Sequence, residues 1–148
     1  MPRTKNRIAA GKRFEKQIAD FLVSLGWRVE RANPKLMFLG PGRMISKAHD
    51  FFGNTDHIAV HPGVPFTLFI QASLDSGMGP LKMRKMDEMA WNAAQRRQVW
   101  LKDRTARGRI IVHYRLPDRW EERSFRMQEG AWPESILGPC PSADAILP

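Results

Sequence analysis

The sequence predicts an α/β domain in which helices flank a central sheet. Apolar residues recur at helical spacing in two segments, Gly11 to Leu25 and Leu81 to Arg97, and short runs typical of strands lie between and after them. The 148 residues fit one domain, and the apolar fraction of 43% is that of a globular protein. We expect a single domain over residues 1–148 with the order α-β-β-β-α-β and a closing hairpin.

The opening segment is basic and then amphipathic. Residues 1–10 hold little that is apolar and predict a basic arm that leads into a helix. From Gly11 the apolar residues form one stripe, and Gly26 can end the helix. Glu15 borders this stripe, so it is either a solvated carboxylate paired with lysines or a side chain on the rim of the core.

Three strand-like runs follow this helix. Residues 27–31 alternate apolar and polar positions, as a half-buried strand does. Residues 33–47, with two prolines and two glycines, predict an irregular loop, whose apolar run 36–39 is a short buried element or a contact surface for a partner chain. Residues 56–60 and 68–73 predict paired strands, because prolines and a glycine between them favour a turn.

The second half of the chain predicts one more helix and three more strands. The helix over 81–97 directs Met83, Met86, Met89, Ala90 and Ala93 inward and Lys82, Arg84 and Lys85 outward. Residues 98–102 predict a fourth strand, and 109–115 with 120–126 predict the closing hairpin. The tail over 129–148 is rich in Pro, Gly and Ser and predicts an irregular segment on the surface.

The charge balance points to a polyanionic partner. The 24 Lys and Arg outnumber the 15 Asp and Glu, which gives a net charge of +9. Nucleic acid is the first candidate; an anionic membrane surface is weaker, because the cations are spread over many elements. No run is apolar for long enough to span a bilayer. A lone cysteine, Cys140, and the lack of an apolar signal-peptide core favour the cytoplasm.

Oxygen-bearing side chains stand out on the central strands. If these strands pair, Asp56 and Gln71 come close together near one end of the sheet, where their oxygens suit a hard cation such as Mg²⁺. Asp50 is either a further carboxylate of this site or a turn former beside Gly and Asn. His57 and His61 are too far apart on a strand for zinc.

This order, with a glutamate in the first helix and D…QxS on the second and third strands, resembles the PD-(D/E)XK nuclease superfamily. Within it, the chain is most similar to small archaeal-type Holliday junction resolvases, including those carried by phages. The resemblance spans about residues 8–115, and it is carried by GKRFEKQIADFLVSLGWRVERA and DFFGNTDHIAVHPGVPFTLFIQAS. It implies a restriction-endonuclease-like αβββαβ core with a mixed sheet flanked by helices, and a C-terminal hairpin and irregular tail outside that core.

The resemblance also implies the roles of individual residues. Asp56 would bridge the metal, Gln71 would supply its amide oxygen, Ala72 its backbone carbonyl, and Glu15 would complete the site directly or through a water. The metal would be Mg²⁺, with Mn²⁺ as a substitute. Such an ion can generate hydroxide near neutral pH and stabilise charge on a phosphate.

Two positions depart from the family pattern. Gln71 replaces an acid, which lowers the expected metal affinity, and Ser73 replaces the usual lysine of the catalytic set. A cation from another element could take the place of that lysine: Lys82, Lys85 or Lys47. Basic residues would hold the DNA backbone without reading its sequence: Arg7, Lys12, Arg13, Lys47, Lys82 and Lys85.

The leading hypothesis is therefore a Mg²⁺-dependent endonuclease that cuts branched DNA at four-way junctions. Paired cuts need two sites related by symmetry, so a homodimer is expected, with residues 36–39, Trp120 and Trp132 as candidate interface. The location would be the cytoplasm, that of the host if a phage encodes the protein. The alternatives are another nuclease of the superfamily, acting on flaps, nicks or damaged DNA, and a non-catalytic DNA-binding protein.

Overall fold

The computed structural model describes the backbone of residues 2–32, 35–40, 43–47, 51–103, 105–127 and 132–137. Side chains are described over the same ranges except at residues 2–5, 35–40, 43–47, 76 and 135. The predictions made for Asp50, Cys140, the side chain of Lys47 and the apolar run 36–39 as an interface lie outside the described residues, as does most of the tail.

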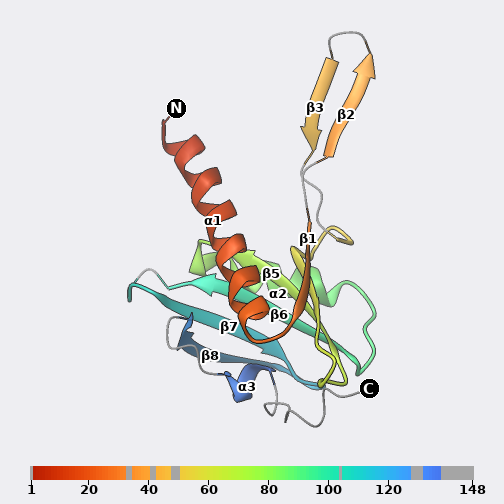
Figure 1. The fold of residues 1–148 in the computed structure, drawn as a ribbon, viewed down its shortest axis with the longest axis vertical. Helices are drawn as coiled ribbons and strands as arrows, with labels where there is room; N and C mark the ends of the chain where they lie inside the picture. Colours follow the sequence, from red (N-terminus) through yellow and green to blue (C-terminus); the bar gives the residue numbers. More distant parts are fainter. Residues whose placement is uncertain are drawn as a thin grey trace.

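Within the described residues the chain is an α/β protein built on a mixed sheet of six strands, as predicted (Figure 1). The strands lie in the order β1-β4-β5-β6-β7-β8, and only β5 and β6 are parallel neighbours. A separate antiparallel pair, β2 and β3, lies outside this sheet. The elements are α1 (Pro2–Ser24), β1 (Arg28–Arg31), β2 (Lys35–Gly40), β3 (Arg43–Lys47), β4 (His57–Val60), β5 (Thr67–Ser73), η1 (Ser76–Met78), α2 (Gly79–Asp87), β6 (Gln95–Lys102), β7 (Arg109–Arg115), β8 (Trp120–Arg126) and α3 (Glu134–Leu137).

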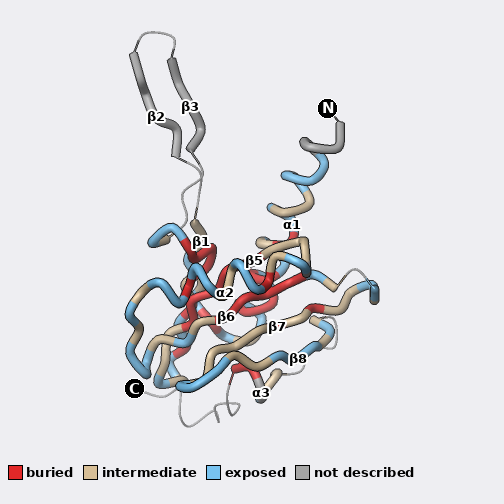
Figure 2. The backbone as a smooth tube through the Cα atoms, turned by 180° about the vertical axis from the view of Figure 1, so that it is seen from behind, coloured by how far each residue is buried: buried red, intermediate tan, exposed pale blue. Residues whose placement is uncertain are grey.

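The sheet buries a hydrophobic layer on each face, because successive side chains of a strand point to opposite sides. On one face Leu68, Ile70 and Trp100 pack against α1. On the other face Phe69 and Val99, with Leu101, pack against Met86 of α2. The buried residues follow the central strands, whereas residues 6–9 of α1 are exposed (Figure 2). The helices α1 and α2 therefore lie on opposite faces of the sheet.

The first helix is longer than predicted. The sequence predicts a basic arm over residues 1–10, whereas α1 begins at Pro2. Proline is tolerated in the first turn of a helix, and the residues that follow include the strong helix formers Ala9 and Ala10. The basic segment is therefore part of a helix that projects beyond the sheet (Figure 1).

The second helix is shorter than predicted and ends at Asp87, and β6 already begins at Gln95. The Asn92 side chain accepts a hydrogen bond from the backbone N–H of Ala94 at 2.9 Å, which favours a turn over a helix. Met86 is buried as predicted, but Ala90 and Ala93 are exposed and not inward.

Two segments predicted to be irregular are ordered. Part of the loop 33–47 forms the β2–β3 hairpin, which projects from the same end of the sheet as the start of α1 (Figure 1). In the tail, α3 buries Ile136 and Leu137 in the core instead of lying on the surface. Its carbonyl at Ile136 accepts a hydrogen bond from buried Gln98 at 2.9 Å, and this contact fixes α3 on the sheet.

The two tryptophans predicted to be exposed are half-buried. Trp120 donates its indole N–H to Asp87 at 2.9 Å, and Trp132 stacks on Trp27 with ring centroids 6.0 Å apart. Both contribute to packing within the chain, and their place at a dimer interface stays a prediction. No helix among the described residues is both long and apolar enough to cross a membrane.

Candidate active site

The site predicted on the central strands forms at one end of the sheet. β4 and β5 pair with His57 opposite Ile70, and Asp56 donates its backbone N–H to the Ile70 carbonyl at 2.8 Å. Its carboxylate oxygen Oδ2 accepts hydrogen bonds from Gln71 Nε2 at 2.9 Å and from the backbone N–H of Ala72 at 2.8 Å. Asp56 and Gln71 are only 8% and 5% exposed. The strand register therefore brings the predicted carboxylate and amide into direct contact.

Glu15 is tied to the same end of the sheet by its backbone. The ring Nε2 of His57, the residue after Asp56, donates a hydrogen bond to the Glu15 carbonyl at 2.8 Å. The Glu15 side chain is half-buried, and its carboxylate lies 3.9 Å from the guanidinium of Arg31. Glu15 thus lies on the rim of the core with an arginine beside it, and the predicted helix glutamate is held close to the central strands.

The imidazole ring of His57 makes this contact in its uncharged form. Its ring is fully buried. Burial lowers the pKa of His57 from 6.5 to about 4; the hydrogen bond to the Glu15 carbonyl opposes this shift and the charge of Arg31 adds to it. The ring is therefore uncharged at neutral pH, and the tautomer with hydrogen on Nε2 is the one that can donate to the carbonyl.

We expect this histidine to make the protein less stable in mild acid. The unfolded chain takes up a proton near pH 6.5 but the folded chain only near pH 4, so stability falls as the pH drops between these values, by about 3 kcal/mol in all. His57→Gln, which keeps a donor for the Glu15 carbonyl but cannot be protonated, should lose this part of the pH dependence. Urea unfolding of both proteins from pH 7.5 to 4 measures the difference. Identical pH profiles would contradict the conclusion that His57 is buried in its uncharged form.

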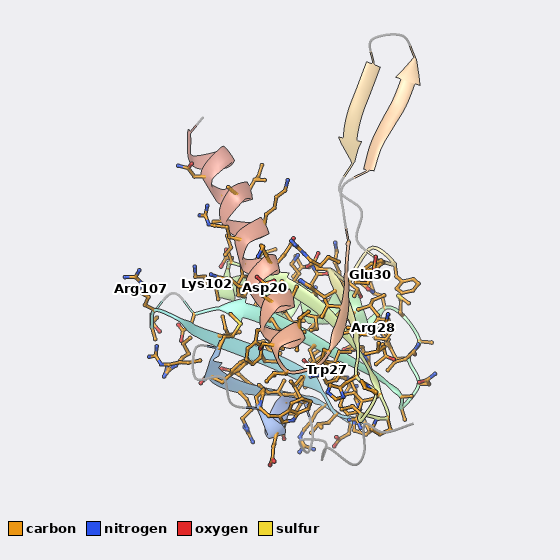
Figure 3. All side chains as sticks on the ribbon, in the orientation of Figure 1. Asp20, Trp27, Arg28, Glu30, Lys102 and Arg107 are labelled. Atoms are coloured by element: carbon orange, nitrogen blue, oxygen red, sulfur yellow. The ribbon has the colours of Figure 1, made fainter. Side chains whose placement is uncertain are left out.

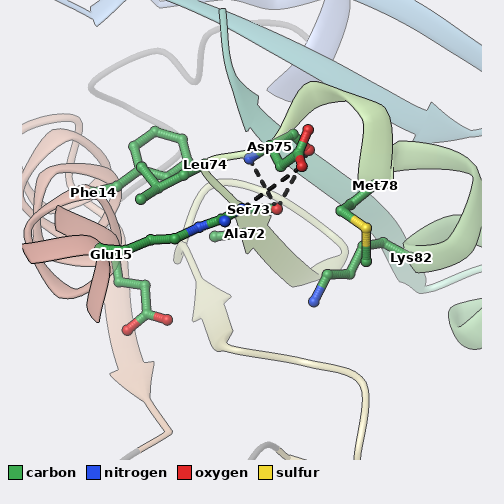
Figure 4. A pocket seen from close by; sticks show the side chains of 10 residues that line it. Phe14, Glu15, Ala72, Ser73, Leu74, Asp75, Met78 and Lys82 are labelled. Atoms are coloured by element: carbon green, nitrogen blue, oxygen red, sulfur yellow. Dashed lines mark hydrogen bonds and ion pairs between the residues drawn. The ribbon is translucent and has the colours of Figure 1, made fainter. Parts of the chain in front are cut away.

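A cavity of about 330 Å³ lies beside the end of β5, and Asp56 and Gln71 are not among its lining residues. Ala72, whose N–H bonds Asp56, forms part of its wall. Figure 4 shows Glu15 entering from α1 and Lys82 from α2, with Ala72 and Ser73 between them. The cavity is lined by Arg7, Gly11, Phe14, Glu15, Ala72, Ser73, Leu74, Asp75, Met78 and Lys82.

A larger cavity of about 620 Å³ lies between α1 and the β6–β7 connection. It is lined by residues that include Asp20 of α1, Lys102 at the end of β6 and Arg107 of the β6–β7 connection (Figure 3). It shares no lining residue with the smaller cavity. The smaller cavity is the candidate active site, because Glu15 and Ala72, the residue whose N–H bonds Asp56, both line it.

The predicted DNA-binding cations divide into two groups. Arg7 and Lys82 line the cavity. Lys12, Arg13 and Lys85 are exposed on α1 and α2 and do not line it. Lys82, predicted to point outward with its neighbours, is half-buried instead.

Asp75 is the residue of the cavity that the sequence pattern did not single out. Its carboxylate accepts a hydrogen bond from the N–H of Gly77 at 2.9 Å and lies 3.7 Å from the guanidinium of Arg7. Its own N–H donates to the Ser73 hydroxyl at 3.2 Å. In the sequence, Asp75 is recognisable only as an aspartate two residues after Ser73 at the end of a strand. This pattern is common in ordinary turns and does not indicate a functional site.

The donor set offered to a metal consists of oxygen. Among the described residues no group of three or more His, Cys, Asp or Glu could hold a metal ion. The carboxylate of Asp56, the amide oxygen of Gln71 and the carbonyl of Ala72 remain as potential ligands, and Glu15 lies on the rim of the same site. Such a set fits Mg²⁺ in chemical type and does not fit zinc. Gln71 now turns its N–H toward Asp56, so its amide must rotate to present oxygen to an ion.

The site is therefore a buried carboxylate–amide pair at a sheet end, next to a cavity with acidic and basic walls. No family model, no curated protein and no solved structure matches this chain.

Proposed function

We propose that the protein is a Mg²⁺-dependent endodeoxyribonuclease of the PD-(D/E)XK type that cuts branched DNA. The observation that carries this proposal is the contact of Asp56 Oδ2 with both Gln71 and Ala72, together with a cavity that Ala72 and Glu15 line. The order α1-β1-β4-β5-α2-β6 around the site supports it, since it is the αβββαβ order of that superfamily with a hairpin inserted. Mn²⁺ is expected to substitute for Mg²⁺.

The residues of the site have separate tasks in this reaction. Asp56, Gln71 and Ala72 would hold the ion, with Glu15 as a direct ligand or as the acceptor of a bound water. A bound ion would supply a hydroxide near neutral pH and would stabilise charge on the phosphate. Asp56 is fixed by its two hydrogen bonds, and neutral His57 holds α1 so that Glu15 stays near the strands. Ser73 has no charge and cannot supply a cation to the phosphate.

Charge and shape support branched DNA as the substrate. The net charge of +9 favours a phosphate backbone. The start of α1 and the β2–β3 hairpin both project from the end of the sheet that holds the site (Figure 1), and two projections can lie between the arms of a branched duplex. Paired cuts across a four-way junction require a homodimer with two-fold symmetry. The cytoplasm, of the host if a phage carries the chain, is the location that fits this substrate.

Cleavage of labelled DNA tests the proposal. We expect the protein to cut a four-way junction at paired positions with Mg²⁺ or Mn²⁺, and not with Ca²⁺ or EDTA. The reason is that Mg²⁺ and Mn²⁺ can both bind the oxygen ligands of the site and activate a bound water. Flap, nicked and linear duplexes of the same sequence are the comparison substrates. Preference for a flap or a nick would favour another nuclease of the superfamily, and equal cutting of linear duplex would contradict junction selectivity. Salt-sensitive binding without cutting of any substrate would favour a non-catalytic DNA-binding protein.

A further inference from the structure

The cavity beside the site holds a cation on each of two walls. Among the described residues that line it, Arg7 comes from α1 and Lys82 from α2. Arg7 is paired with Asp75 at 3.7 Å. Lys82 forms no ion pair within the described part of the chain. Lys82 is therefore the cation of this cavity whose charge is not already matched by a carboxylate.

The start of α2 is fixed, and this fixes the position of Lys82. Gly79, the first residue of the helix, is buried so closely against the sheet that a Cβ there would lie 3.0 Å from Leu101 Cδ1 and 3.3 Å from His113 Nε2. Fully buried Met86 anchors the helix near its other end. Lys82 lies in the first turn of α2, close to the point where Gly79 packs against the sheet. The backbone position of Lys82 is therefore fixed.

Lys82 lines the cavity from α2, and Ala72 and Ser73 lie between it and Glu15 (Figure 4). Ser73 ends β5, and its hydroxyl is bonded to Asp75. A lysine at position 73 and a lysine at position 82 would thus serve the same cavity from two different elements. Lys85, one turn further along α2, is exposed and does not line the cavity.

We propose that Lys82 is a catalytic residue that contacts the phosphate being cut, in place of a cation on the third strand. The inference rests on the proposed nuclease function. As the oxygen of water bonds to phosphorus, the phosphorus bond to the leaving oxygen breaks, water loses a proton to solvent and the leaving oxygen takes one up. The Lys82 ammonium keeps its protons throughout and donates a hydrogen bond to a non-bridging oxygen, where negative charge grows.

The first test compares alanine variants on the same helix. Lys82→Ala should lower the rate of junction cleavage about 100-fold, as loss of one donor to a developing charge does, with junction affinity in Ca²⁺ changed by less than about threefold. Arg84→Ala removes an exposed positive charge two residues after Lys82 on the same helix, and this variant should cut the junction as fast as the wild type. Lys82→Arg should keep part of the activity because it keeps the charge.

The second test moves the cation back to the strand. Ser73→Lys in the Lys82→Ala background should restore at least about tenfold of the lost rate, since both positions line the same cavity. A residue that only supported the fold of α2 would not be replaced by a lysine on β5. Failure of Ser73→Lys to restore cutting by a variant with wild-type stability would contradict the shared position of the two cations.

A third measurement does not depend on cleavage. Acetylation of lysines by acetic anhydride, with junction DNA and Ca²⁺ present, should be slowed at Lys82 at least about fivefold more than at Lys102, which lines the other cavity. If the wild type cuts and Lys82→Ala cuts as fast as Arg84→Ala, the role of Lys82 is overturned and the nuclease proposal stands. If the wild type cuts no DNA substrate, both the nuclease proposal and the catalytic role of Lys82 are contradicted. Equal acetylation of the two lysines also overturns the contact with phosphate.

Discussion

Asp56→Asn is expected to lower junction cleavage by about 10³-fold or more while junction binding in Ca²⁺ changes little. The substitution removes the buried negative charge that would hold the metal, and without a held ion neither the attacking water nor the phosphate is activated. Binding depends on the basic surface, and loss of one anion does not weaken that surface. Single-turnover cleavage and gel-shift titration at one salt concentration measure the two effects separately.

Asparagine is chosen because it preserves the hydrogen bonds of the site. Its carbonyl oxygen, in the place of Oδ2, can still accept from both the Ala72 N–H and Gln71 Nε2. Asp118→Asn, an exposed change in the β7–β8 turn, is the matched control for loss of one negative charge and should cut normally. Cutting by Asp56→Asn at more than about a tenth of the wild-type rate would show that this carboxylate does not hold a catalytic metal.

The sheet could be predicted from the sequence where the pattern is local. Residues 56–60 and 68–73 carry apolar runs bounded by turn residues, and β4 and β5 form there. The C-terminal end of α2 could not be predicted from the local pattern. Ala90 and Ala93 continue the helical spacing of apolar residues, although the turn at Asn92 interrupts the helix. In α3, Ile136 and Leu137 are buried through contacts with β6, which is far away in the chain. Such contacts leave no periodic signal in a tail rich in Pro and Gly.

The same division holds for the candidate site. The contact between Asp56 and Gln71 follows from strand register, which turn length and apolar pattern define. Glu15 was placed near the strands by its position beside the apolar stripe of α1, and the His57 contact agrees with that. The cavity beside them depends on how α1 and α2 dock on the sheet. For that reason Asp75 was missed, and Lys82, predicted to face outward on its helix but also named as a possible cation of the site, could not be told apart from Lys85.

Gln71→Glu is expected to make the stability of the protein depend on Mg²⁺. The new carboxylate would replace an amide whose nitrogen lies 2.9 Å from Asp56 Oδ2, so two buried negative charges would meet where a hydrogen bond now stands. Without metal at pH 7 we expect the free energy of unfolding to fall by about 3 kcal/mol. With Mg²⁺ the pair becomes a stronger ligand set, the loss should be recovered, and metal affinity should rise about tenfold.

Acid should have the same effect as metal in this variant. Repulsion raises the pKa of the pair in the folded state, so the folded protein holds a proton that the unfolded chain has lost, and stability increases as the pH falls through that pKa. Urea unfolding at pH 7 and pH 5, with and without Mg²⁺, measures this, and calorimetric titration gives the metal affinity. Gln98→Glu is the matched control, because Gln98 is equally buried and bonded but its partners are Ile136 and Trp100, not a carboxylate. It should be destabilised with no recovery in Mg²⁺. Recovery of both variants, or of neither, would contradict a metal held between residues 56 and 71.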